Sequence, residues 1–190
     1  MTETNKKLEE RKNKLLEFIK RNYILIGILI FALVIRLYYF WVTKDQGLWW
    51  DELSYGILAK NLVIHQWDNA RIIIGETNIR PLFLPIIWSF LMRLNLSEVA
   101  SKFILEIIPS FFAVLFTYLV GKQLYNKRIG LIASFIMAVS WMTIFYSVRF
   151  MTHIPGLLAS LASIYLFFKA IETEKINFKY FSASIFLFFM

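Results

Sequence analysis

Residues 23–42 read YILIGILIFALVIRLYYFWV, an apolar stretch that carries a single charge, Arg36. At about 1.5 Å of rise per residue, a helix of this length reaches roughly 30 Å, the thickness of the hydrocarbon core of a bilayer. The stretch therefore predicts a membrane-spanning helix. Similar apolar runs predict further spans at 103–120, 129–148 and 154–170, and a fifth, incomplete span at 178–190.

The composition agrees with this prediction. Of the 190 residues, 58% are hydrophobic and 18% aromatic, which is more apolar than a soluble domain of this length. The chain has no cysteine, so disulfides, thiolate catalysis and cysteine-ligated metal sites are excluded. We predict an all-α fold, a multi-pass transmembrane helical bundle in the cell membrane.

The net charge of +8 is distributed unevenly along the chain. Seven of the 21 basic residues precede the first span, at positions 6, 7, 11, 12, 14, 20 and 21, and acidic residues are interleaved with them. A basic flank predicts that the N-terminus lies in the cytoplasm. We expect residues 1–22 to form a short amphipathic arm on the membrane surface, with lipids and not nucleic acid as its partner.

Residues 43–102 are predicted to form one long extracytoplasmic loop. Its apolar run 81–92 (PLFLPIIWSFLM) is too short to cross a bilayer and is interrupted by Pro85. If this run does not cross, the basic loop 121–128 (GKQLYNKR) faces the cytoplasm, as the positive-inside rule requires. We therefore expect two interfacial helices in the outer loop, near 51–65 and 81–93.

This topology gathers charged side chains at the outer membrane surface. Two carboxylates lie behind a tryptophan pair in GLWWDELSY (47–55), and Arg36 lies about 9 Å below the interface. A partly dehydrated carboxylate suits a general base, and arginines suit an anionic leaving group such as a phosphate. The residues that we expect to meet there are Asp51, Glu52, Arg80, Arg149 and His153.

The same segments resemble the N-terminal part of the GT-C membrane glycosyltransferases, specifically the dolichyl-phosphate-mannose-protein mannosyltransferase and aminoarabinose-transferase-like group. The resemblance covers nearly all of residues 22–175, with its motifs in the family's order. These motifs are Arg36-Leu37 near the end of the first span, DELSY at 51–55, Arg80-Pro81-Leu82-Phe83, LVGKQLY at 119–125 and FYSVRFMTHIP at 145–155.

The resemblance implies transfer of a sugar such as mannose from a polyprenyl- or dolichyl-phosphate carrier to a hydroxyl acceptor on protein, lipid or glycan, with inversion. It implies that Asp51 is the general base and that Glu52 supports it. The residues expected to contact the phosphate or the substrate are Arg80, Arg36, Arg149, Tyr55 and His153. We expect no cofactor and no protein metal site, although a divalent metal ion is left open, as is the oligomeric state.

One position departs from the family pattern, because His153 stands where many relatives have an acidic residue. The chain also ends within its fifth apolar run, so we expect either a longer natural protein or a truncated product. The alternative function is therefore a catalytically inactive, truncated relative with a structural or partner-binding role. A transporter is less favoured, because no predicted span carries a broken helix with paired charges.

Several of these residues also have a purely structural interpretation. Asp51 is a suitable cap for a helix that begins at Glu52, and Glu52 suits the first turn of that helix. Trp49 and Trp50 are typical of membrane-interface anchors. The charges at positions 102 and 106 are one helical turn apart, so we expect Lys102 and Glu106 to pair with each other.

Overall fold

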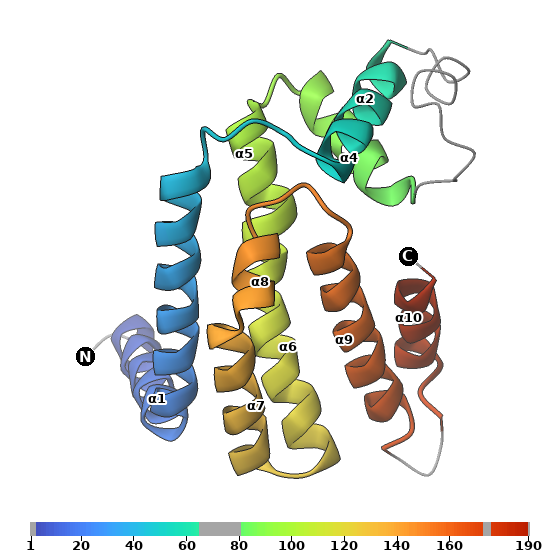
Figure 1. The fold of residues 1–190 in the computed structure, drawn as a ribbon. Coiled ribbons are helices and arrows are strands. Elements are labelled where there is room, and N and C mark those ends of the chain that lie inside the picture. The colour runs from blue at the N-terminus through green and yellow to red at the C-terminus, as the bar shows by residue number, and fades with distance from the viewer. Residues whose placement is uncertain (1–2, 65–80, 173–175, 190) are drawn as a thin grey trace.

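The computed structural model describes residues 3–64, 81–172 and 176–189. These residues form helices joined by short connections and include no strand (Figure 1). The predicted all-α fold is therefore confirmed. In chain order the helices are α1 (Glu3–Thr43), α2 (Asp51–Val63), α4 (Phe83–Arg93), α5 (Glu98–Lys102), the π-helix η1 (Phe103–Ile107), α6 (Ile108–Leu124), α7 (Lys127–Val139), α8 (Trp141–Tyr146), α9 (His153–Ala170) and α10 (Phe178–Phe188).

Three helical stretches in the described residues are long and apolar enough to cross a membrane, namely Arg11–Thr43, Glu98–Leu124 and His153–Ala170. The second of these runs without a break through α5, η1 and α6. Large apolar side chains on their outer faces are exposed, such as Trp41 at 72%, as a lipid-facing surface requires. The prediction of a helical membrane bundle is confirmed, while the side of the membrane that each end faces stays a prediction.

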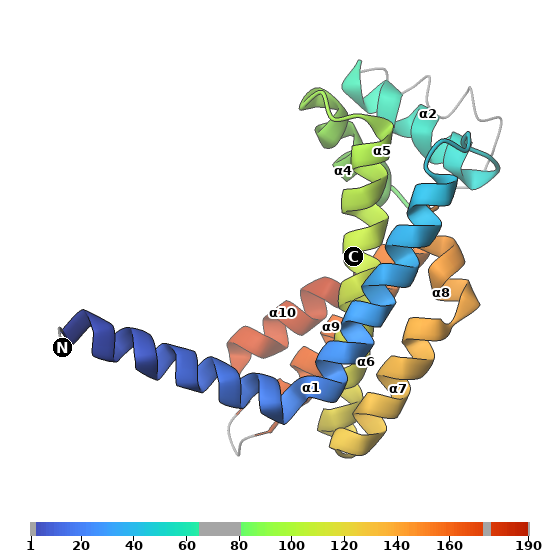
Figure 2. The ribbon, with the colours of Figure 1, turned by 90° about the vertical axis from the view of Figure 1, so that its left-hand side faces the viewer.

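The first helix bends at the boundary expected for the N-terminal arm. Asn22 has non-helical backbone angles (φ −123°, ψ 17°), and its side-chain amide donates to the Phe18 carbonyl at 3.0 Å. Lys127, at the start of α7, donates to the Arg21 carbonyl beside the bend. As a result, the arm points away from the bundle (Figure 2).

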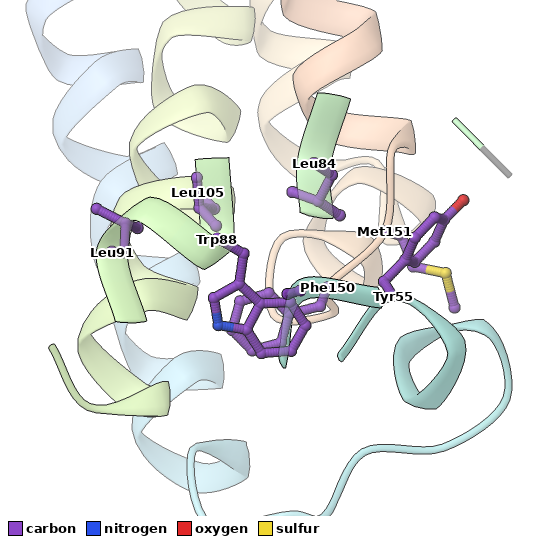
Figure 3. Close-up of a cluster of buried hydrophobic side chains, with 8 residues drawn as sticks. Tyr55, Leu84, Trp88, Leu91, Leu105, Phe150 and Met151 are labelled. Carbon is purple, nitrogen blue, oxygen red and sulfur yellow. The ribbon is translucent and has the colours of Figure 1, made fainter. Parts of the chain in front are cut away.

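Helices α2 and α4 lie together at the other end of the bundle (Figures 1 and 2). Their facing side chains form a hydrophobic core with Leu105 of η1 and with the segment that joins α8 to α9 (Figure 3). At the centre of this core the Trp88 and Phe150 rings stack, with centroids 3.7 Å apart. The core therefore attaches the short helices to the spans. Its buried members are Tyr55, Ala59, Leu84, Trp88, Leu91, Leu105, Phe150 and Met151.

The predicted third span, 129–148, is not one helix. Ser140 has φ −60° and ψ 117°, an extended conformation that separates α7 from α8. The break leaves the last carbonyl groups of α7 without helical partners. We expected no span that is a broken helix with paired charges. This span is broken, but the charged side chain at the break, Arg36, binds carbonyl and hydroxyl oxygens and not a carboxylate.

Arg36 of α1 occupies this break with a guanidinium group that is fully buried. The group has five N–H donors, and each has an acceptor. The acceptors are Ser110 Oγ at 2.6 Å from Nε, the Ala32 and Ala138 carbonyls at 3.1 Å from Nη1, and the Met137 carbonyl at 3.4 Å and Thr143 Oγ1 at 3.3 Å from Nη2. A cation is also favourable at a helix C-terminus, where the helix dipole is negative. Arg36 thus joins α1, α6, α7 and α8.

We expect Arg36→Met to lower the free energy of unfolding by about 2–5 kcal/mol, because it leaves buried carbonyl groups without donors. Arg36→Lys should also destabilise the protein, because one ammonium group cannot replace the planar set of five donors. Chemical unfolding in detergent micelles measures both changes. Lys20→Met, at an exposed position of the arm, is the control and should change stability by less than about 0.5 kcal/mol. Wild-type stability in Arg36→Met would contradict this role.

Candidate functional site

The acidic pair of the sequence opens helix α2. The helix begins at Asp51, and Trp50 is its N-cap residue, with φ 53° and ψ −130°. The idea that Asp51 caps a helix beginning at Glu52 is therefore wrong. A positive φ at a bulky residue is strained and is characteristic of functional sites. Asp51 is half-buried, so it remains accessible from outside the protein.

Glu52, by contrast, is fully buried and binds a segment far from it in the sequence, residues 149–150. Its Oε1 accepts the Phe150 backbone N–H at 2.8 Å, and its Oε2 lies 3.3 Å from Nη1 of Arg149 in an ion pair. Oε2 also accepts the Trp49 backbone N–H at 3.3 Å. Glu52 is thus more than a residue favoured in the first helical turn, because it holds the start of α2 against residues 149–150.

Arg149 is held on several sides. Its Nη2 donates to Gln46 Oε1 at 2.9 Å, and its guanidinium carbon lies 4.9 Å from the centroid of the Trp49 ring and 5.5 Å from that of Phe145. These contacts suit a planar cation between aromatic rings. Among the described residues its Nε has no hydrogen-bond partner. The group therefore retains donor capacity beyond its contacts with Glu52 and Gln46.

The segment that joins α8 to α9, residues 147–152, is named here the α8–α9 connection. Besides Glu52, it contacts a second buried carboxylate, because Glu106 Oε1 lies 3.2 Å from the Met151 backbone nitrogen. The Lys102 ammonium lies 5.4 Å from the centroid of the Phe150 ring. We expected Lys102 and Glu106 to pair with each other, and the structure instead directs both toward the α8–α9 connection.

The other predicted site residues lie in different surroundings. Tyr55 of α2 is 4% exposed and belongs to the core that α2 shares with α4 (Figure 3). His153 is exposed, and its ring stacks on Tyr146 with centroids 4.3 Å apart. Arg36 lies inside the bundle with all its donors engaged, so its surroundings do not support a phosphate-binding role. Arg80 lies outside the described residues.

Sequence reasoning did not place four groups of this cluster in the site. Lys102 and Glu106 carried a usable signal, since charges next to or within an apolar span are functional candidates by default. Gln46 and the backbone amide of Phe150 carried none, because neither residue type nor spacing marks them. Within the described residues, no group of three or more His, Cys, Asp or Glu side chains could hold a metal ion.

Comparison with known proteins identifies a family for this chain. The sequence model of the family described as dolichyl-phosphate-mannose-protein mannosyltransferase matches residues 79–190, more than half of the chain. The matched part includes Glu106, Arg149 and His153, whereas Asp51 and Glu52 precede it. Neither the search of curated proteins nor that of solved structures gives a match.

The geometry predicts the stability of variants at Glu52. Glu52→Leu should lower the free energy of unfolding by about 3–5 kcal/mol, because it leaves the buried Arg149 charge and two backbone amides without their acceptor. Glu52→Gln should lower the free energy of unfolding by less, because an amide oxygen still accepts from the backbone. Chemical unfolding in detergent measures both variants.

The control uses an ion pair at the surface. Lys44 and Asp45 are 2.6 Å apart, and the Asp45 side chain is 78% exposed. Asp45→Asn should therefore change stability by less than about 1 kcal/mol. If Glu52→Leu and Asp45→Asn lowered the free energy of unfolding equally, the role given to the buried pair of Glu52 and Arg149 would be contradicted.

Proposed function

Because the chain belongs to the dolichyl-phosphate-mannose-protein mannosyltransferase family, we propose that it acts as a membrane glycosyltransferase. The proposed donor is a sugar such as mannose on a polyprenyl or dolichyl phosphate. The proposed acceptor is a hydroxyl group of a protein, lipid or glycan, and the sugar is transferred with inversion at its anomeric carbon.

The observation that carries this proposal is the contact between Glu52 and Arg149, which are 97 residues apart in the sequence. It places the acidic start of α2 beside a cation of the α8–α9 connection. Asp51, next to Glu52, is half-buried and faces a different environment from its neighbour. A carboxylate that substrate can reach, with a fixed cation near it, is the combination that an inverting transfer from a phosphate requires.

In the proposed reaction, Asp51 accepts the proton of the acceptor hydroxyl while the hydroxyl oxygen attacks the anomeric carbon. The bond between that carbon and the phosphate oxygen breaks, and the lipid phosphate leaves with the bonding electrons. Donors of Arg149 that Glu52 and Gln46 do not use stabilise the charge on the phosphate. Arg80 remains a second candidate for this contact, and Glu52 keeps Arg149 in place.

A second candidate function is a catalytically inactive relative with a structural or partner-binding role. His153 favours it, because a neutral imidazole cannot supply the negative charge that many relatives have at this position. In the structure the ring of His153 stacks on Tyr146. Absence of sugar transfer by the wild-type protein, in membranes supplied with acceptor and lipid-linked donor, would favour this candidate.

We expect Asp51→Asn to reduce sugar transfer by about 100- to 10,000-fold, because an amide cannot accept the hydroxyl proton. Transfer from a polyprenyl-phosphate sugar in membranes that contain the protein measures the loss. Asp45→Asn, in the same loop but at an exposed position, should retain full activity. Wild-type rates in Asp51→Asn would show that Asp51 is not the base.

A further inference from the structure

We infer that Glu106 is a positioning residue, which holds the α8–α9 connection and thereby the guanidinium of Arg149. Only the catalytic consequence of this inference rests on the proposed function. The contact of Glu106 with the backbone can be tested without any activity.

The α8–α9 connection needs such support, because it is not helical and yet it is buried. Ser147 and Phe150 are fully buried, and Val148 and Met151 are 2% and 8% exposed. Backbone amides removed from water require acceptors, and a non-helical segment does not supply them in a regular way. The positions of its acceptors therefore determine its conformation.

Two consecutive amides of the connection find carboxylates from two different helices. The Phe150 N–H donates to Glu52 of α2 at 2.8 Å. The Met151 N–H is shared between the Arg149 carbonyl at 2.7 Å, which closes a tight turn at Phe150, and Glu106 Oε1 at 3.2 Å. Loss of Glu52 would remove the carboxylate that accepts from Phe150, and loss of Glu106 would remove the one that accepts from Met151.

Glu106 comes from the π-helix η1, a widened turn inside an otherwise α-helical run. The Ile108 N–H bonds to the Phe103 carbonyl five residues earlier. Such turns change the direction of the side chains that they carry and are frequent at functional sites. Here the side chain of Glu106 is directed at the α8–α9 connection and not along its own helix.

One buried cation lies within electrostatic range of Glu106, whose second oxygen, Oε2, has no hydrogen-bond partner among the described residues. Lys102, which is 1% exposed, interacts electrostatically with Glu52 and Glu106. Its ammonium group also lies near the Phe150 ring, whose face stacks on Trp88. A buried carboxylate is tolerated only with such partners. The backbone and the side chain of the connection are thus held by groups from α2, α4, α5 and η1.

Hydrogen exchange of the whole chain in detergent micelles, followed by mass spectrometry, tests the contact. Glu106→Leu removes one of the two acceptors of the Met151 N–H, and exchange in residues 147–152 should become about tenfold faster. Glu106→Gln retains an oxygen at the same reach, so its exchange should stay within about twofold of the wild type. Glu106→Asp is one methylene shorter and should resemble Glu106→Leu.

The exchange experiment has internal and matched controls. Among the described residues, Glu106 accepts its hydrogen bond from Met151 and not from α7, so exchange of α7 should be unchanged. Glu98→Gln, at an exposed acid of α5, should behave as the wild type. If Glu106→Leu speeds up exchange throughout the chain, the contact is tested by comparing exchange at residues 147–152 in Glu106→Asp and in Glu106→Gln. Wild-type exchange in Glu106→Asp, or equally fast exchange in Glu106→Gln, would overturn the inference.

The catalytic consequence needs a separate measurement. Where the wild type transfers sugar, Glu106→Leu should raise the KM for the lipid-linked donor by about tenfold, and Glu106→Gln should restore it. An unchanged KM in Glu106→Leu would show that the connection does not position Arg149 for the donor. Faster exchange at residues 147–152 in Glu106→Leu would support the contact, even if the wild-type protein transfers no sugar. The absence of sugar transfer by the wild type would count against the proposed function.

Discussion

Hydrocarbon offers no hydrogen-bond partners, so every interruption of a helix inside a membrane protein must be satisfied by the protein itself. Residues 3–64, 81–172 and 176–189 include two such interruptions within the bundle, the break at Ser140 and the α8–α9 connection. The break exposes carbonyl oxygens, and an arginine, Arg36, donates to them. The connection exposes amide groups, and two glutamates accept from them. In each case the charge of the side chain is opposite to the partial charge of the backbone atoms that it binds.

These solutions require charges in the interior, where an isolated ion is unstable. The protein meets this requirement by bringing opposite charges and dipoles to the same places. Glu52 faces Arg149, Lys102 lies within electrostatic range of both glutamates, and Arg36 lies at the negative end of α7. The buried charges therefore stabilise irregular backbone and also determine where the helices meet.

The adjacent carboxylates Asp51 and Glu52 show how the fold separates structural from chemical roles. Glu52 is buried and engaged with a cation and two backbone amides, which leaves it unsuited to exchange protons with a substrate. Asp51, one residue earlier on the helix, is half-buried. Two neighbouring carboxylates in different environments can take different roles, as catalytic pairs commonly do. The strained N-cap at Trp50 determines how the pair enters the helix.

The sequence by itself determined the helical class and most of the long apolar helices, because length and hydropathy depend on local residues alone. It also singled out Asp51, Glu52 and Arg149. Only the tertiary structure decided that Arg36 satisfies a helix break, that Tyr55 is a core residue and that Glu106 contacts Met151. The role of Tyr55 depends on its packing against residues of other segments. The roles of Arg36 and Glu106 depend on hydrogen bonds between segments about 45 to 107 residues apart, in which one partner is often a backbone atom. Backbone atoms are common to all residue types, so no sequence pattern can reveal which distant side chain they will bind.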